Sequence, residues 1–115
     1  MQELCVVDRL FPSILSGEKT STIRWREVRI EPGYMTYICE DDPNKTAVVW
    51  VTNCTDVPLS EVAAFVGKET EWPDAVMLEG MRKHYPEIEL VDIVQVVEHL
   101  TPAQTLQLKN SQSQD

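Results

Sequence analysis

The chain has 115 residues, of which 43% are hydrophobic and 7% aromatic, so it suits one domain and leaves no room for a second. Its 10 basic and 19 acidic residues give a formal net charge of −9, which disfavours tight binding to DNA or long RNA. No run of about 18 apolar residues is present, and the N-terminus lacks signal-peptide features. We therefore expect a cytoplasmic protein with no membrane partner.

The N-terminal part of the chain predicts a strand, a helix and a second strand. Residues 4–7 form an apolar run of strand composition. Residues 11–16 are predicted as a short helix, because Pro12 stands near its start and Gly17 follows its last residue. Residues 20–25 are rich in β-branched and aromatic side chains, so we expect a strand there.

The rest of the chain alternates strand and helix signals. Residues 34–39 and 46–54 have strand composition and flank a polar turn cluster, which predicts a hairpin with a longer loop. Apolar residues at helical spacing predict a helix over 59–66, and Pro73 is a favourable first residue for another. Residues 91–97 are the most β-prone run and are predicted as the closing strand.

These elements predict a mostly β fold of the α+β class. We expect a small barrel of about five or six strands, with two or three short helices at its rim. Residues 1–100 are predicted to form this domain. Thr101 to Gln104 can cap one short helical turn, and the polar segment 101–115 is predicted to be a largely disordered tail.

The three cysteines are widely spaced, and each lies in or beside an apolar run: Cys5, Cys39 and Cys54. Buried, reduced thiols explain them better than a disulfide framework. No Cys-x-x-Cys or His-x-x-x-His spacing is present, so we predict no metal site and no cofactor.

The densest set of reactive side chains lies between residues 16 and 27. After the pair Ile14-Leu15, the stretch runs Gly17-x-Lys19-Thr20-x-Thr22-Ile23-Arg24. It resembles the signature of the ASCH domains, a branch of the PUA-like β-barrel superfamily. The variant with threonine rather than glutamate before Ile-Arg looks most similar to the motif of the small bacterial ASCH amidohydrolases that deacetylate N4-acetylcytidine. The resemblance spans residues 4 to 98, and it implies a PUA-like barrel.

The resemblance implies roles for two residues of this stretch. The lysine that matches Lys19 acts as a base in the amidohydrolase branch, and the threonine that matches Thr22 is the nucleophile. The chemistry is plausible because a desolvated lysine loses its proton more easily and can then accept the hydroxyl proton of a threonine. A surface lysine beside an ordinary strand threonine is the simpler alternative.

The family's third catalytic group is a glutamate in the loop between two helices, where this chain departs from the pattern. The matching position is Thr70, flanked by Glu69 and Glu71. We prefer Glu71 as the acid, because the neighbouring Trp72 offers an apolar wall that would raise a carboxyl pKa. Glu69 is the alternative and a candidate for substrate binding, and a solvated acidic loop explains either residue equally well.

Two further residues are candidates for substrate binding. Arg24 matches the arginine of the motif and can bind a carbonyl, a carboxylate or a phosphate, or it can pair with Glu27 or Glu71. Trp25 is a candidate for stacking on a base.

The resulting hypothesis is an amidohydrolase that acts on a modified pyrimidine nucleoside. The alternatives are a non-catalytic module that binds a nucleotide or a short RNA, as many PUA-like domains are thought to do, and a ribonuclease, an activity that some ASCH relatives have. The expected partner is a small nucleoside or nucleotide, with RNA as a further possibility.

Overall fold

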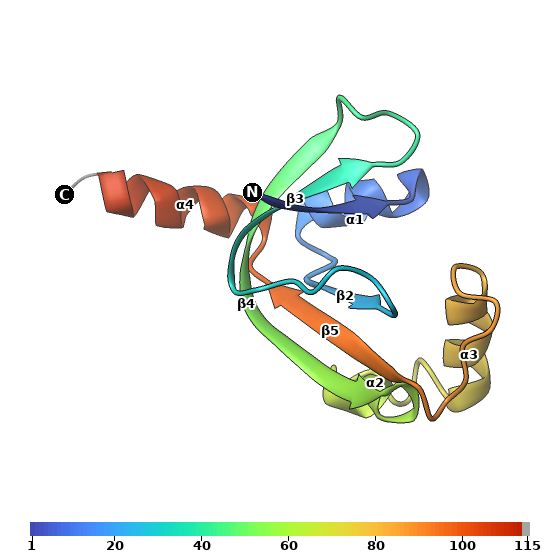
Figure 1. The fold of residues 1–115 in the computed structure, drawn as a ribbon. Coiled ribbons are helices and arrows are strands. Elements are labelled where there is room, and N and C mark those ends of the chain that lie inside the picture. The colour runs from blue at the N-terminus through green and yellow to red at the C-terminus, as the bar shows by residue number, and fades with distance from the viewer. Residues whose placement is uncertain (114–115) are drawn as a thin grey trace. The chain divides into compact units, whose positions relative to one another are not determined.

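The computed structural model describes residues 1–113, which divide into two compact units. Unit 1 consists of Met1–Thr22, Ile30–Cys54 and the chain from Val97 onward; unit 2 consists of Ile23–Arg29 and Thr55–Val96. The composition alone did not indicate this division. Each unit is described by itself below, with the elements as labelled in Figure 1.

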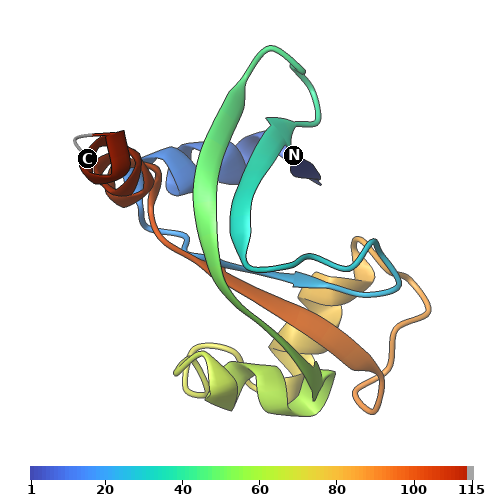
Figure 2. The same ribbon diagram turned by 60° about the vertical axis from the view of Figure 1, so that its left-hand side comes forward.

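The five strands of the sheet follow the order β1–β3–β4–β5–β2. Their bounds are Gln2–Val6 for β1, Ser21–Arg24 for β2, Gly33–Cys39 for β3, Thr46–Pro58 for β4 and Ile93–His99 for β5. In unit 1, β1 pairs with β3 in parallel, and β3 pairs with β4 as an antiparallel hairpin. Figure 2 shows this hairpin and the loop that joins its strands.

The core of unit 1 arises from strict alternation along β3. Met35, Tyr37 and Cys39 are buried and their neighbours are not, because side chains two apart in a strand share one face. The register places Leu4 of β1 opposite Tyr37, and Met35 opposite Val49 of β4. The same core takes in the buried face of helix α1.

Helix α1, Phe11–Ser16, ends as its sequence predicts. Gly17 has a φ of 85°, the left-handed conformation that a side chain disfavours, and its N–H donates to the carbonyl of Ile14 at 3.2 Å. Phe11 and Ile14 face the core. A single turn of 3-10 helix, Asp8–Leu10, precedes α1.

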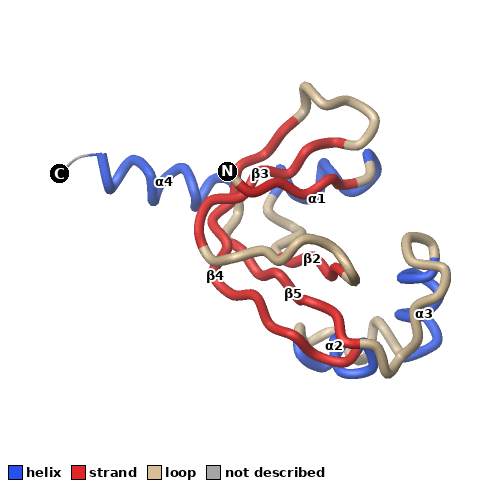
Figure 3. Tube along the Cα trace, viewed as in Figure 1, coloured by secondary structure: helices blue, strands red, loops and turns tan. Residues whose placement is uncertain are grey.

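Unit 2 has a separate core built on two helices and the first half of β5. Helix α2, Leu59–Phe65, follows β4 directly, and helix α3, Asp74–Arg82, begins after Pro73. Figure 3 shows α2 and α3 as two helical segments separated by loop. The buried members of this core are Leu59, Val62, Ala63, Met77, Met81, Ile88, Val94 and Val96.

Helix α4, Pro102–Ser113, occupies most of the segment predicted to be a disordered tail. A reciprocal cap begins it: the Gln104 N–H donates to Thr101 Oγ1 at 3.1 Å, and the Thr101 N–H donates to Gln104 Oε1 at 3.0 Å. Thr105 is buried and its hydroxyl accepts the Trp50 N–H at 2.9 Å, which anchors α4 in unit 1. The prediction of disorder at residues 114–115 lies outside the described residues.

The structure confirms the α+β fold class and each predicted strand, with boundaries shifted by a few residues. Four α-helices occur among residues 1–113, against the two or three expected, because α4 was not foreseen as a full helix. Cys5 is exposed and not buried as predicted, whereas Cys39 is buried. In the described part of the chain, no helix has both the length and the apolar character needed to cross a bilayer.

Candidate functional site

The motif that begins at Gly17 contributes Lys19 and Thr22 to unit 1. Lys19 follows the left-handed turn at Gly17, and its backbone N–H donates to the carbonyl of Ser13 at 2.9 Å, which ties it to α1. Its side chain is partly buried. Thr22 lies in β2 and is only 5% exposed, so the hydroxyl predicted as nucleophile is largely withdrawn from bulk water.

A buried pair from distant parts of the chain accompanies these residues in unit 1. Tyr37 and His99 are 0% and 5% exposed, and the Tyr37 hydroxyl lies 2.8 Å from His99 Nε2. His99 Nδ1 lies 2.8 Å from the Leu100 carbonyl, so Nδ1 carries the proton and Nε2 accepts from Tyr37. The His99 backbone N–H donates to the carbonyl of Thr20 at 2.9 Å, which fixes the chain between Lys19 and Thr22.

The imidazole of His99 is held in its neutral form. Burial lowers its pKa below the usual 6.5, and the positive charge of Lys19 lowers it further, whereas the hydrogen bond to Leu100 acts in the opposite direction. Both ring nitrogens are already hydrogen-bonded, so we interpret His99 as a structural residue that holds the segment 19–22 in place and does not transfer protons.

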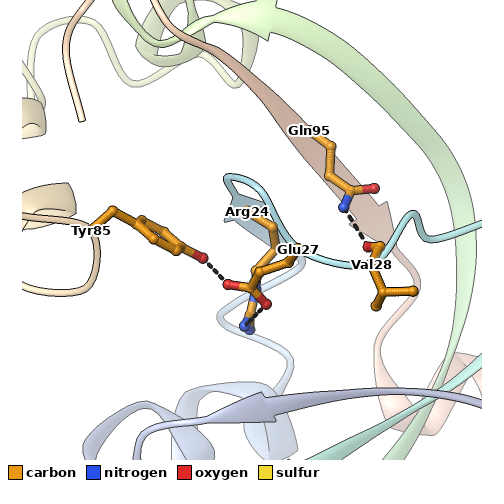
Figure 4. Close-up of polar contacts among 5 residues, drawn as sticks. All are labelled: Arg24, Glu27, Val28, Tyr85 and Gln95. Carbon is orange, nitrogen blue, oxygen red and sulfur yellow. Dashed lines mark hydrogen bonds and ion pairs between the residues drawn. The ribbon is translucent and has the colours of Figure 1, made fainter. Parts of the chain in front are cut away.

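In unit 2, Arg24 and Glu27 form the ion pair that the sequence offered as one alternative for Arg24. Arg24 Nη1 lies 3.4 Å from Glu27 Oε1, and the hydroxyl of Tyr85 donates to the second oxygen, Glu27 Oε2 (Figure 4). Burial, together with the hydrogen bond and negative charge of Glu27, raises the pKa of Tyr85 to about 12. Tyr85 therefore remains a hydrogen-bond donor at neutral pH.

The segment 25–29 that carries Glu27 is anchored near its C-terminal end. The side-chain amide of Gln95, a buried polar residue of β5, donates to the Val28 carbonyl at 2.9 Å (Figure 4). Arg29 forms an ion pair with Asp56. Together with the hydrogen bond from Tyr85, these contacts hold three consecutive residues, Glu27, Val28 and Arg29, so Glu27 is pre-positioned.

Trp25 lines an open pocket within unit 2. The pocket has a volume of about 490 Å³ and is lined by Trp25, Arg26, Glu27, His84, Tyr85, Pro86 and Glu87. The Trp25 and Tyr85 rings lie 5.9 Å apart at 85°, and the guanidinium of Arg26 lies 4.2 Å from the centre of the Trp25 ring. Arg26 has a φ of 57°, an unusual conformation for a residue with a side chain.

The two glutamates predicted for the acid role lie in the exposed loop between α2 and α3. Glu71 forms an ion pair with Lys68 at 3.3 Å, and the Lys68 amine also lies 5.9 Å from the centre of the Trp72 ring. Trp72 packs against the core of unit 2. Glu69 is exposed. The environment of Glu71 is thus a solvated ion pair, and Trp72 is engaged with Lys68 and the core.

The candidate residues therefore fall into two groups, one in each unit. Lys19 and Thr22 belong to unit 1; Arg24, Trp25, Glu69 and Glu71 belong to unit 2. The sequence offered Glu27 as one possible partner of Arg24, but it gave no sign of Tyr37, His99 or Tyr85 as hydrogen-bonded partners in these groups. Among residues 1–113, no three His, Cys, Asp or Glu side chains are placed to hold a metal ion.

Comparison with solved structures identifies the fold. The chain is similar to ZmASCH of Zymomonas mobilis, in crystal structures of two single-residue mutants: TM-scores of 0.63 and 0.62, each with 10% sequence identity. The matches cover 85% and 84% of this chain, and 67% and 65% of the ZmASCH chains. No protein-family model and no curated protein sequence matches the chain. The chain therefore has an ASCH-like fold.

Proposed function

We propose that this ASCH-fold protein is an amidohydrolase that removes an acyl group from the exocyclic amine of a modified pyrimidine nucleoside, such as N4-acetylcytidine. The support is the signature from Gly17 to Arg24, together with a fold of the kind that signature implies. The observation that carries the proposal is the setting of Lys19. It is partly buried near a neutral, buried histidine, in the unit that also holds the buried hydroxyl of Thr22.

In the proposed reaction, Thr22 Oγ attacks the carbonyl carbon of the acyl group while Lys19 Nζ takes the hydroxyl proton. The bond between the acyl carbon and the exocyclic nitrogen then breaks, and that nitrogen gains a proton to become the amine of the product. Water finally hydrolyses the acyl ester on Thr22. The products are the free nucleoside and the carboxylic acid.

Lys19 must be neutral to act as a base. A lysine with its reference pKa of about 10.4 is almost wholly protonated at pH 7, so the protein has to favour the neutral amine. Removal from water acts in that direction, because it destabilises the ammonium. The partial burial of Lys19 is consistent with this requirement.

The acid that protonates the leaving nitrogen is proposed to be Glu71, with Glu69 as the alternative. The ion pair of Glu71 with Lys68 has to open for this role, because the carboxyl group must be free to reach the leaving nitrogen. Single substitutions Glu71→Gln and Glu69→Gln separate the two candidates, because only the loss of the true acid slows the release of the amine.

The direct test is to incubate the purified protein with N4-acetylcytidine and to follow cytidine by chromatography, with the Thr22→Ala variant as the control. The proposal requires cytidine and acetate in equal amounts from the wild type alone. If the wild type binds the nucleoside and never releases cytidine, the protein is a binding module instead. Binding of a nucleoside without catalysis is the second candidate function, and the aromatic pocket at Trp25 favours it.

A further inference from the structure

Glu27 stands out among the carboxylates of unit 2 because both of its oxygens are held in place while the group stays open to solvent. Tyr85 donates to Oε2, and Arg24 lies 3.4 Å from Oε1. The Glu27 side chain is nevertheless 33% exposed. A carboxylate offers about four lone-pair positions, so two donors leave acceptor capacity for a ligand.

The walls beside Glu27 suit a flat ring. Trp25 and Tyr85 meet nearly at a right angle, and Pro86 extends the apolar lining of the pocket. Flat rings bind to such aromatic walls with little dependence on their exact identity. The aromatic residues therefore provide affinity for any flat ring. Discrimination between one ring and another has to come from the Glu27 carboxylate beside them.

The charges around the pocket nearly cancel. Arg24 and Arg26 are balanced by Glu27 and Glu87, and the hydroxyl of Tyr85 is neutral at physiological pH because its pKa is about 12. A neutral heterocycle thus meets no net electrostatic penalty here.

We propose that this pocket binds a heterocyclic base with an exocyclic amino or amido group, and that Glu27 selects it by accepting a hydrogen bond from the exocyclic N–H. The inference rests on the proposed function for its choice of an aminopyrimidine, and it assigns Glu27 as the residue that determines specificity. Tyr85 and Arg24 are positioning residues, because they orient the Glu27 carboxylate.

The chemistry separates cytosine from uracil at one position. Cytosine presents N4–H donors, which a carboxylate accepts, whereas uracil presents a carbonyl oxygen at the same place. With uracil, the Glu27 carboxylate faces the O4 carbonyl, and both groups are hydrogen-bond acceptors. The carboxylate then gives up its hydrogen bonds to water and gains none from the ligand. We expect cytidine to bind at least about tenfold more tightly than uridine, since a hydrogen bond to a charged group contributes more than the 1.4 kcal/mol that corresponds to tenfold.

The test measures the dissociation constants of cytidine and uridine by nuclear magnetic resonance titration, following the Trp25 indole N–H. In Glu27→Gln, the amide can donate to the uracil oxygen, so the preference for cytidine should fall to about unity. Tyr85→Phe should weaken the preference in part, because Glu27 keeps Arg24 but loses its stronger anchor. Glu79→Gln, which removes an exposed carboxylate of α3, should leave the preference unchanged.

The outcomes separate this inference from the proposed function. An unchanged preference for cytidine in a folded Glu27→Gln protein overturns the role of Glu27, even if the wild type hydrolyses N4-acetylcytidine. Equal binding of cytidine and uridine to the wild type overturns it as well. Loss of the preference in Glu27→Gln supports the pocket, even if the wild type shows no turnover.

Discussion

The two units hold their polar side chains in opposite environments. In unit 1, Tyr37 and His99 are buried, and burial lowers the pKa of the imidazole. In unit 2, Glu27 is partly exposed and the pKa of Tyr85 is raised to about 12, so the donor and the acceptor keep fixed roles. Unit 1 therefore holds a neutral pair that is shielded from water, whereas unit 2 holds a carboxylate that stays open to solvent.

The largest expected effect follows from the replacement of Lys19. Lys19→Arg keeps a positive charge but leaves no group that can accept a proton at neutral pH. Loss of a general base reduces turnover by about 10² to 10⁴. The measurement is kcat with N4-acetylcytidine.

A matched control for this change is Lys45→Arg, which alters an exposed lysine of unit 1 in the turn before β4 and should retain the wild-type rate. If Lys19→Arg also keeps that rate, Lys19 is not the base.

A second comparison concerns two glycines with similar backbone conformations, one in each unit. Gly17 and Gly67 have φ values of 85° and 75°, but a Cβ on Gly17 would lie 2.8 Å from Thr101 Cγ2, whereas a Cβ on Gly67 would meet nothing within 4 Å. The left-handed conformation costs about 1–2 kcal/mol for alanine, and overpacking adds about 1–3 kcal/mol. Gly17→Ala should therefore destabilise the protein by about 2–5 kcal/mol in urea unfolding, against about 1–2 kcal/mol for Gly67→Ala.

The control for these glycines is Gly80→Ala. Gly80 lies inside α3 with no atom near its would-be Cβ, so alanine should stabilise the helix by about 0.5–1 kcal/mol. Equal losses of stability for Gly17→Ala and Gly67→Ala would show that the contact with Thr101 is unimportant.

Local signals explain why most of the fold could be predicted from sequence. Gly17 after a short apolar run marks the end of α1, and the alternation in β3 marks a strand with one buried face. The length of α4 was missed because its composition is polar, and its anchor is the contact of Thr105 with Trp50, 55 positions away. A local pattern carries no information about such a partner.

Candidate site residues could be proposed from the sequence only where a motif is contiguous. Lys19, Thr22 and Arg24 lie close together in the sequence and were found together. Tyr37 and His99 are 62 positions apart, and Glu27 and Tyr85 are 58 apart, so neither pair forms a sequence pattern. His99 ends an apolar strand, and Tyr85 was interpreted only as the end of a helix.

The smallest expected effect is a pH dependence of stability that arises from His99. Its pKa in the folded protein lies below the value of 6.5 for an unfolded chain, so the unfolded state takes up a proton first as the pH falls. The free energy of unfolding should therefore decrease as the pH drops through about 6.5, and level off below the folded pKa. Urea unfolding at a series of pH values measures this.

Two variants test the origin of that slope. His99→Gln should flatten it, and His84→Gln, which alters an exposed histidine of unit 2, should not. Tyr37→Phe removes the donor to Nε2, so it should raise the pKa of His99 and reduce the slope. An unchanged slope in both His99→Gln and Tyr37→Phe contradicts the assignment.

If Thr22 receives the acyl group as proposed, mass analysis of the protein's peptides detects the acylated enzyme. The wild type is mixed with N4-acetylcytidine, quenched in acid after a short time and digested. We expect one added acetyl group on the peptide that contains Thr22, the same modification of the corresponding peptide in a slower Thr22→Ser variant, and none in Thr22→Ala. Cytidine release by Thr22→Ala at the wild-type rate, with no acetylated peptide in either protein, would contradict it.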